Sequence, residues 1–127
     1  MTDIKRHGLT IGIERVNNNF FLSFKAIGTL THEDYEAITP LIDNALKGVK
    51  EPHINALVDI TEFEGWEPRA MWDDFKIGLK YGFDFDKIAI YGKNRLLEYG
   101  LKITSWFMGG EVKSFDTQEE ALEWLQQ

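Results

Sequence analysis

The sequence predicts a single α/β domain over residues 1–127, with an N-terminal antiparallel hairpin, then βαβ units, and about four helices packed on the mixed β-sheet. Three observations predict this fold class. The chain is long enough to bury one core without disulfides or metals. Its first part alternates apolar and polar residues around an Asn-rich turn, which is typical of a hairpin. Its remainder alternates short apolar runs with segments of helical periodicity, and right-handed βαβ crossovers make such strands parallel.

The first half of the chain predicts the hairpin and one helix. Residues 11–16 and 20–27 are the two expected strands, and Asn17–Asn19 is the turn between them. Thr31 is a suitable N-cap for a helix that ends near Gly48. We expect the apolar stripe of this helix to comprise Tyr35, Ile38, Leu41, Ile42, Ala45 and Leu46.

The second half predicts three strands and three helices. Its first and second strands are continuous apolar runs, which indicates burial on both faces of the sheet. The expected elements in order are a strand at 54–60, a helix from Pro68 to about Gly82, a strand at 87–91, a helix from Arg95 to about Met108, an edge strand at 112–115 and a final helix capped by Thr117–Glu120.

Composition excludes several classes of function. The chain has no cysteine, which excludes disulfides and thiolate metal sites and fits a reducing cytoplasm. A net charge of −7, without a Lys/Arg stripe, argues against nucleic acid as a partner. No apolar run approaches the roughly 20 residues that cross a bilayer. We therefore expect a soluble cytoplasmic protein that contacts membranes, if at all, peripherally through apolar side chains.

Residues for catalysis or metal binding lack the necessary context. The three histidines have no metal-binding spacing, and no phosphate-binding loop accompanies Asp59. We expect no catalytic residue, no metal and no cofactor. Asp59 and Thr61 are expected to form a strand-end turn, in which Asp59 caps local N–H groups. An enzymatic alternative rests on Asp59, Thr61 and Glu62, and it requires a pocket near Asp59 with convergent polar groups of shifted pKa.

Aromatic and other large apolar residues are concentrated after the strand at 54–60 and in the helix at 95–108. Their number exceeds what one buried face of each helix requires. One interpretation is ordinary core residues, helped by a dimer contact. The other is a partly exposed apolar patch that binds a lipid-like ligand, a membrane surface or a protein partner. The candidate binding residues are Phe63, Trp66, Met71, Trp72, Phe75, Trp106 and Phe107.

The order of strands, with the segment Leu57–Phe63 placed before a helix, resembles STAS domains, the group typified by the anti-anti-sigma factor SpoIIAA. In those domains a strand ends in Asp, a small polar residue follows, and a helix opens at a phosphorylatable Ser or Thr. Asp59 and Thr61 match the first two elements. The expected helix start, Trp66–Ala70, has no Ser or Thr. The phospho-acceptor of the family is therefore not carried over to this chain.

The chain is more similar, over nearly its whole length, to the SpoIIAA-like (STAS/SEC14-like) bacterial proteins. The similarity rests on the Trp- and Phe-rich segment after the Asp-containing strand and on the ending Phe115–Leu125. This resemblance implies a mixed sheet akin to a small CRAL-TRIO domain. It also implies binding of an apolar or lipid-like ligand at membranes.

Two functions follow as expectations. The first is a non-enzymatic module that binds a small apolar or lipid-like ligand, with peripheral membrane association. The alternative is a STAS-like protein-interaction module that acts as a homodimer without the usual phospho-acceptor serine.

Overall fold

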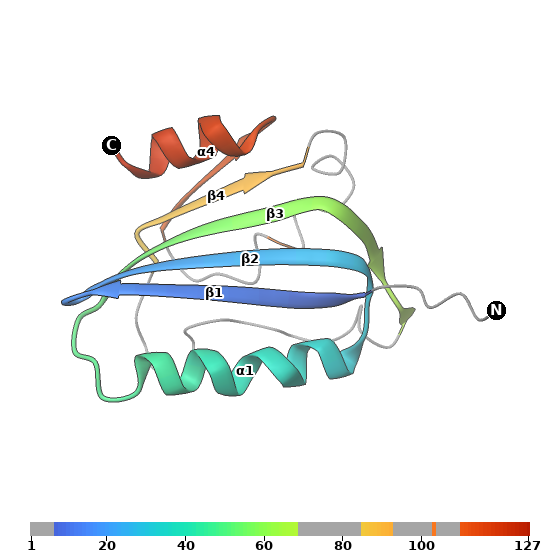
Figure 1. Ribbon diagram of the computed structural model, residues 1–127, viewed down its shortest axis with the longest axis horizontal. Helices are drawn as coiled ribbons and strands as arrows, with labels where there is room; N and C mark the ends of the chain where they lie inside the picture. Colours follow the sequence, from blue (N-terminus) through green and yellow to red (C-terminus); the bar gives the residue numbers. More distant parts are fainter. Residues whose placement is uncertain (1–6, 69–84, 93–102, 104–109) are drawn as a thin grey trace.

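A computed structural model describes residues 7–68, 85–92, 103 and 110–127 of the chain. In these residues five strands form one sheet in the order β1-β2-β3-β4-β5. Helices α1 and α4 lie on opposite sides of this sheet (Figure 1). The predicted mixed α/β sheet is confirmed, but the described residues hold two helices rather than about four. The helices expected at 68–82 and 95–108 lie outside the described residues, apart from their members Pro68 and Ile103.

The N-terminal hairpin consists of β1 (Gly8–Val16) and β2 (Asn19–Leu30), which pair antiparallel. Both strands extend beyond the predicted ranges. The turn between them places Asn17 at φ 57°, a left-handed conformation that asparagine tolerates better than most residues. Alternate β2 residues from Phe20 to Leu30 are buried, which fixes the face that the hairpin turns toward α1.

The other strands run parallel to β2 and to one another. They are β3 (His53–Trp66), β4 (Lys87–Tyr91) and β5 (Glu111–Phe115), and β5 forms the predicted edge. The sequence predicted that the strand at 54–60 ends in a turn. Instead β3 continues to Trp66 along β2, and two shifts in register absorb its extra residues. Pairing of β3 with β4 stops at Asp59, so the part of β3 after Asp59 has no β4 residues beside it.

Helix α1 (His32–Leu46) begins at Thr31, as predicted. The Thr31 hydroxyl accepts the Asp34 N–H, and the Asp34 carboxylate accepts the Thr31 N–H at 2.8 Å, which makes a capping box. The predicted apolar stripe is wrong at Leu41, whose side chain is 49% exposed. The residues that α1 does bury follow a spacing of three and four, which leaves Leu41 outside the stripe: Tyr35, Ile38, Ile42 and Leu46.

Helix α4 (Gln118–Leu125) begins at the predicted N-cap, Thr117. The two faces of the sheet carry separate cores. The larger one lies between the sheet and α1, and the smaller one joins α4 to β3 and β4 through Leu57, Ala89, Tyr91, Ala121, Trp124 and Leu125. α4 packs on β3, β4 and β5. In the described part of the chain, neither helix has the length and apolarity needed to cross a bilayer.

Candidate functional site

The aromatic candidates that the structure describes are Phe63 and Trp66, at the far end of β3. Phe63 is fully buried in the core on the α1 side. Its ring meets the Trp66 ring edge to face, with centroids 4.8 Å apart and planes at 83°. The other predicted binding residues lie outside the described residues: Met71, Trp72, Phe75, Trp106 and Phe107. The structure therefore brings Phe63 and Trp66 together, and it identifies Phe63 as a core residue.

Trp66 is only partly buried, and its orientation is fixed by contacts on two sides. Its indole N–H donates a hydrogen bond to the Tyr35 hydroxyl of α1, and its ring packs against the core. The next residue, Glu67, donates its N–H to the Leu30 carbonyl at 3.0 Å. The one polar atom of the Trp66 side chain is therefore bonded inside the protein. The part of the ring that remains accessible is purely apolar.

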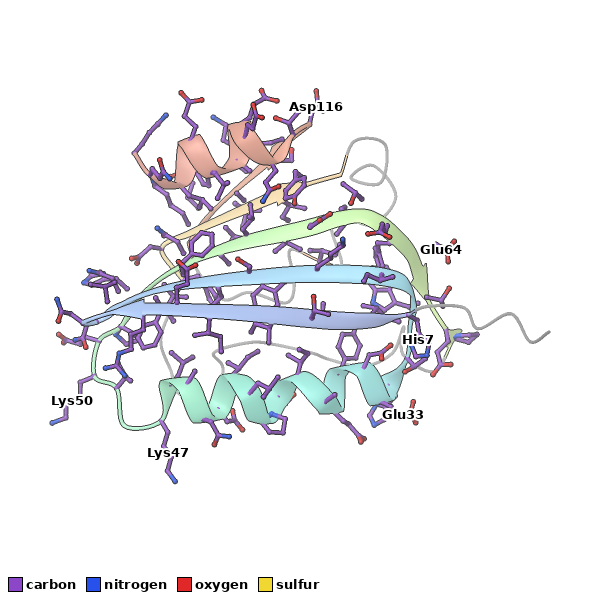
Figure 2. All side chains as sticks on the ribbon, viewed as in Figure 1. His7, Glu33, Lys47, Lys50, Glu64 and Asp116 are labelled. Carbon is purple, nitrogen blue, oxygen red and sulfur yellow. The ribbon has the colours of Figure 1, made fainter. Side chains whose placement is uncertain are left out.

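Among the residues that the structure describes, the charged side chains at this end of the molecule are mainly acidic. Figure 2 shows Glu33 and Glu64 at the end of the molecule where β3 finishes, whereas Lys47 and Lys50 lie at the opposite end, beyond α1. Glu62 and Glu67 lie in the same stretch of chain as Trp66. These carboxylates make the surface beside Trp66 unfavourable for negative charge.

Asp59 is held by its neighbours in β3 and β4. Its carboxylate accepts the Thr61 N–H at 2.8 Å and the Thr61 hydroxyl at 2.6 Å. It thus bonds a local N–H group although the strand continues, because the register shift after Asp59 brings Thr61 within reach. Across the ladder Asp59 is paired with Tyr91, which places the two side chains on the same face of the sheet.

Tyr91 is a site residue that the sequence did not predict. Burial, followed by the hydrogen bond to Asp59 and the charge of that carboxylate, raises the pKa of Tyr91 well above its ordinary value. Tyr91 therefore keeps its proton throughout the physiological range. A usable signal existed, since Asp59 and Tyr91 end two apolar runs of similar type, and parallel pairing places such ends side by side.

These residues border a hollow of about 280 Å³ on the α4 side of the sheet. Thr10, Lys25, Asp59 and Tyr91 lie in one row across four strands, and Gly12, Ser23 and Leu57 form the next row. Gln118, at the start of α4, also lines the hollow. This hollow could not be predicted from the sequence, because its lining residues come from five separate elements.

The hollow lies beside Asp59 and is lined by one polar group of shifted pKa, Tyr91. Its groups are nevertheless poorly suited to acid–base catalysis. A raised pKa makes Tyr91 a weaker acid. The Lys25 ammonium lies 2.6 Å from the Glu62 carboxylate. Among the described residues, no three His, Asp or Glu side chains gather as metal ligands would. What this arrangement supplies is a set of fixed hydrogen-bonding groups.

Comparison with known proteins assigns this fold to a family. The family model described as SpoIIAA-like matches residues 21–126, which is most of the chain. The chain belongs to the SpoIIAA-like family. The predicted resemblance is thereby confirmed, and the fold is that of a STAS-like module.

A solved structure supports the same assignment for this SpoIIAA-like chain. It is an uncharacterised protein of the DUF3478 family from Shewanella loihica PV-4, described as having a SpoIIAA-like fold. The two sequences are 49% identical, and the match covers 98% of this chain and 99% of that one with a TM-score of 0.76. No curated protein matches this chain.

Proposed function

We propose that this SpoIIAA-like protein is a non-enzymatic binding module for an apolar, lipid-like ligand, which binds against Trp66. The observation that carries the proposal is the partial exposure of the Trp66 ring together with the internal hydrogen bond of its N–H group. A half-buried tryptophan whose N–H is bonded internally to Tyr35 presents only apolar surface outward. Such a surface gains free energy when apolar material covers it, at about 25 cal/mol per Å².

The acidic surroundings of Trp66 narrow the ligand class. Glu64 and Glu67 lie close to Trp66 in the chain, whereas the charge of nearby Glu62 is paired with Lys25, and the protein as a whole carries a charge of −7. An anionic head group would be repelled, so the preferred ligand has an uncharged or zwitterionic polar end. Peripheral association with neutral lipid surfaces is compatible with this requirement, whereas attraction to anionic membranes is not.

The absence of enzymatic activity is part of the proposal and is supported by the groups around Asp59. A general base must be open to the proton that it removes. The Oδ1 atom of Asp59 already accepts hydrogen bonds from both donors of Thr61. Tyr91 holds its own proton because its pKa is raised. These groups favour a structural and positioning role over proton transfer.

Trp66→Ala is expected to weaken binding of an uncharged acyl compound by about tenfold or more, because it removes the apolar contact surface. The measurement is isothermal titration calorimetry of delipidated protein with dodecanol. Dodecanoate, which has the same chain length and a negative charge, should bind more weakly than dodecanol to the wild-type protein.

Two variants control this experiment. Trp66→Phe keeps an apolar ring and should retain most of the affinity, which separates contact with ligand from the bond to Tyr35. Leu41→Ala removes an exposed apolar side chain from the outer surface of α1 and should leave binding unchanged. Delipidated wild-type protein that does not bind dodecanol, or a Trp66→Ala protein that binds it equally well, would contradict the proposal.

The second candidate function is the homodimeric STAS-like interaction module, and the edge of the sheet favours it. In the described part of the chain, β1 has a hydrogen-bonded neighbour on one side only. The backbone N–H and C=O groups on the open side of an edge strand can pair with a strand of another molecule. Ile13 and Val16 on this strand are 37% and 69% exposed. Antiparallel pairing of β1 with β1 of a second copy would continue the sheet through a twofold axis.

Ile13→Lys tests this second candidate, because a lysine on an edge strand opposes pairing with another strand. The wild-type protein should sediment as a dimer at micromolar concentration, and Ile13→Lys should shift it to a monomer that keeps the wild-type circular dichroism spectrum. The matched change Leu41→Lys, on exposed α1, should leave the dimer intact. A wild-type protein that remains monomeric at high concentration would rule out the dimer.

A further inference from the structure

The hollow on the α4 side of the sheet is separate from the aromatic end of β3. Phe63 and Trp66 pack with the core on the α1 side. The hollow instead lies beside the start of α4, and Figure 1 shows α1 and α4 on opposite sides of the sheet. Its floor extends from β1 and β2 onto β3 and β4, two strands on which α4 packs. Any ligand of this hollow is therefore independent of the function proposed for Trp66.

Gly12 forms part of the floor, and nothing in the fold requires a glycine there. Glycine inside a strand is less stable than alanine by about 0.5–1 kcal/mol. It usually marks a bulge, a bend, or the close approach of a ligand or another backbone. The pairing of β1 with β2 is continuous from Gly8 to Val16, so there is no bulge. A Cβ at Gly12 would meet only the Ser23 Cβ at 3.7 Å, an ordinary contact. The missing side chain keeps the hollow open.

The polar lining is rich in groups that both donate and accept hydrogen bonds. Ser23 lies directly across from Gly12, and Thr10 lies beside Lys25 in the next row. Gln118 adds a side-chain amide from the start of α4. Hydroxyl and amide groups suit a ligand whose own hydroxyls also donate and accept. Leu57 supplies an apolar part of the floor, which suits the C–H face of such a ligand.

The charges around the hollow are already matched within the protein. The Lys25 ammonium is bonded to Glu62 at 2.6 Å, so binding an anion there would compete with that pair. The Asp59 carboxylate already accepts both donors of Thr61 through Oδ1, so a cation there would compete with these hydrogen bonds. The Lys25–Glu62 pair is exposed, so competition with it is modest, and a neutral ligand leaves both arrangements in place.

We infer that this hollow binds a small neutral polyhydroxylated molecule of about monosaccharide size. The ligand exchanges hydrogen bonds with Ser23, Thr10 and Gln118 and lies against Gly12. The volume of about 280 Å³ falls just below the roughly 300–1,000 Å³ of sites for drug-sized ligands. A shallow site of this kind gives weak binding, with a dissociation constant on the order of a millimolar.

The test uses nuclear magnetic resonance of the full-length, isotope-labelled protein, titrated with glucose, glucosamine and glucuronate. These probes share one ring framework and differ in charge. Glucose should shift the amide signals of Gly12, Ser23 and Gln118 and should bind more tightly than its charged counterparts. Gly12→Val should weaken glucose binding by about tenfold or more, because its side chain fills the floor. Ile13→Val, the same side chain on the opposite face of β1, should change nothing.

Further variants keep the result interpretable. Thr10→Val removes a hydroxyl at constant shape on an exposed position, so it should weaken glucose binding even if Gly12→Val disturbs the strand. Trp66→Ala should leave glucose binding unchanged, which separates this site from the one proposed above. The inference is overturned if glucose shifts no signal in the hollow, if a charged probe binds more tightly, or if Gly12→Val and Thr10→Val both bind glucose as well as the wild type.

Discussion

Phe63→Ala is expected to lower the free energy of unfolding by about 3–5 kcal/mol. Phe63 is among the large side chains with no exposed surface, and it supports the Trp66 ring in edge-to-face contact at 4.8 Å. Removing it would open a cavity between β3 and the core on the α1 side. A loss of this size is a large part of the roughly 5–15 kcal/mol by which domains are stable. Chemical denaturation followed by circular dichroism measures it.

The matched control for Phe63→Ala is Val16→Ala, at an exposed position near the opposite end of the sheet, where the change should be within about 0.5 kcal/mol. If Phe63→Ala also cost less than about 1 kcal/mol, Phe63 would not be a core residue. It would then belong among the ligand-facing residues, as the sequence suggested.

Gly110→Ala is the second substitution expected to have a large effect. Gly110 has φ +78°, and a Cβ there would lie 2.4 Å from the backbone oxygen of Phe85. Both the backbone conformation and the contact exclude a side chain, and backbone cannot move aside as a flexible side chain can. The residue also precedes β5, so displacing it disturbs the pairing of β5 with β4. We expect a loss of about 2–4 kcal/mol in the free energy of unfolding.

Gly12→Ala is the matched glycine control. Its Cβ would make only the 3.7 Å contact with Ser23, on a backbone that needs no positive φ. It should therefore be neutral or stabilising by up to about 1 kcal/mol. Equal melting temperatures for Gly110→Ala and the wild type would show that the backbone at Gly110 adjusts to accept a side chain.

Much of the fold could be predicted because it follows from local signals. The hairpin turn at Asn17, the N-caps Thr31 and Thr117, and the apolar run at 87–91 each specify their element without reference to distant residues. The parallel pairing of β2 with β3 follows from the helical crossover through α1, which returns the chain to the same end of the sheet. The predicted end of the strand at residue 60 was wrong for a different reason. Thr61 to Glu64 resemble a turn in composition, yet β2 supplies a pairing partner for them, and this depends on tertiary context.

The candidate sites were harder to predict, because burial and register determine them. Phe63 and Trp66 are both aromatic residues of the same acidic segment, so the sequence does not distinguish their environments. In the structure Phe63 is fully buried, whereas Trp66 is partly accessible and donates its indole N–H to Tyr35. The row of Thr10, Lys25, Asp59 and Tyr91 exists only through the registers of three strand pairs. No periodicity within one segment reveals such a row, whereas the family resemblance was visible in the sequence and the comparisons confirm it.

The most direct test of the proposed function is the heat-capacity change on binding dodecanol to delipidated protein, obtained by calorimetry at several temperatures. Burial of the apolar Trp66 surface predicts one-to-one binding with a negative heat-capacity change. That change should become smaller in magnitude in Trp66→Ala and should be nearly retained in Trp66→Phe. Absence of binding, or a heat-capacity change that is the same in the wild type and in Trp66→Ala, would contradict the assignment of Trp66 to an apolar ligand site.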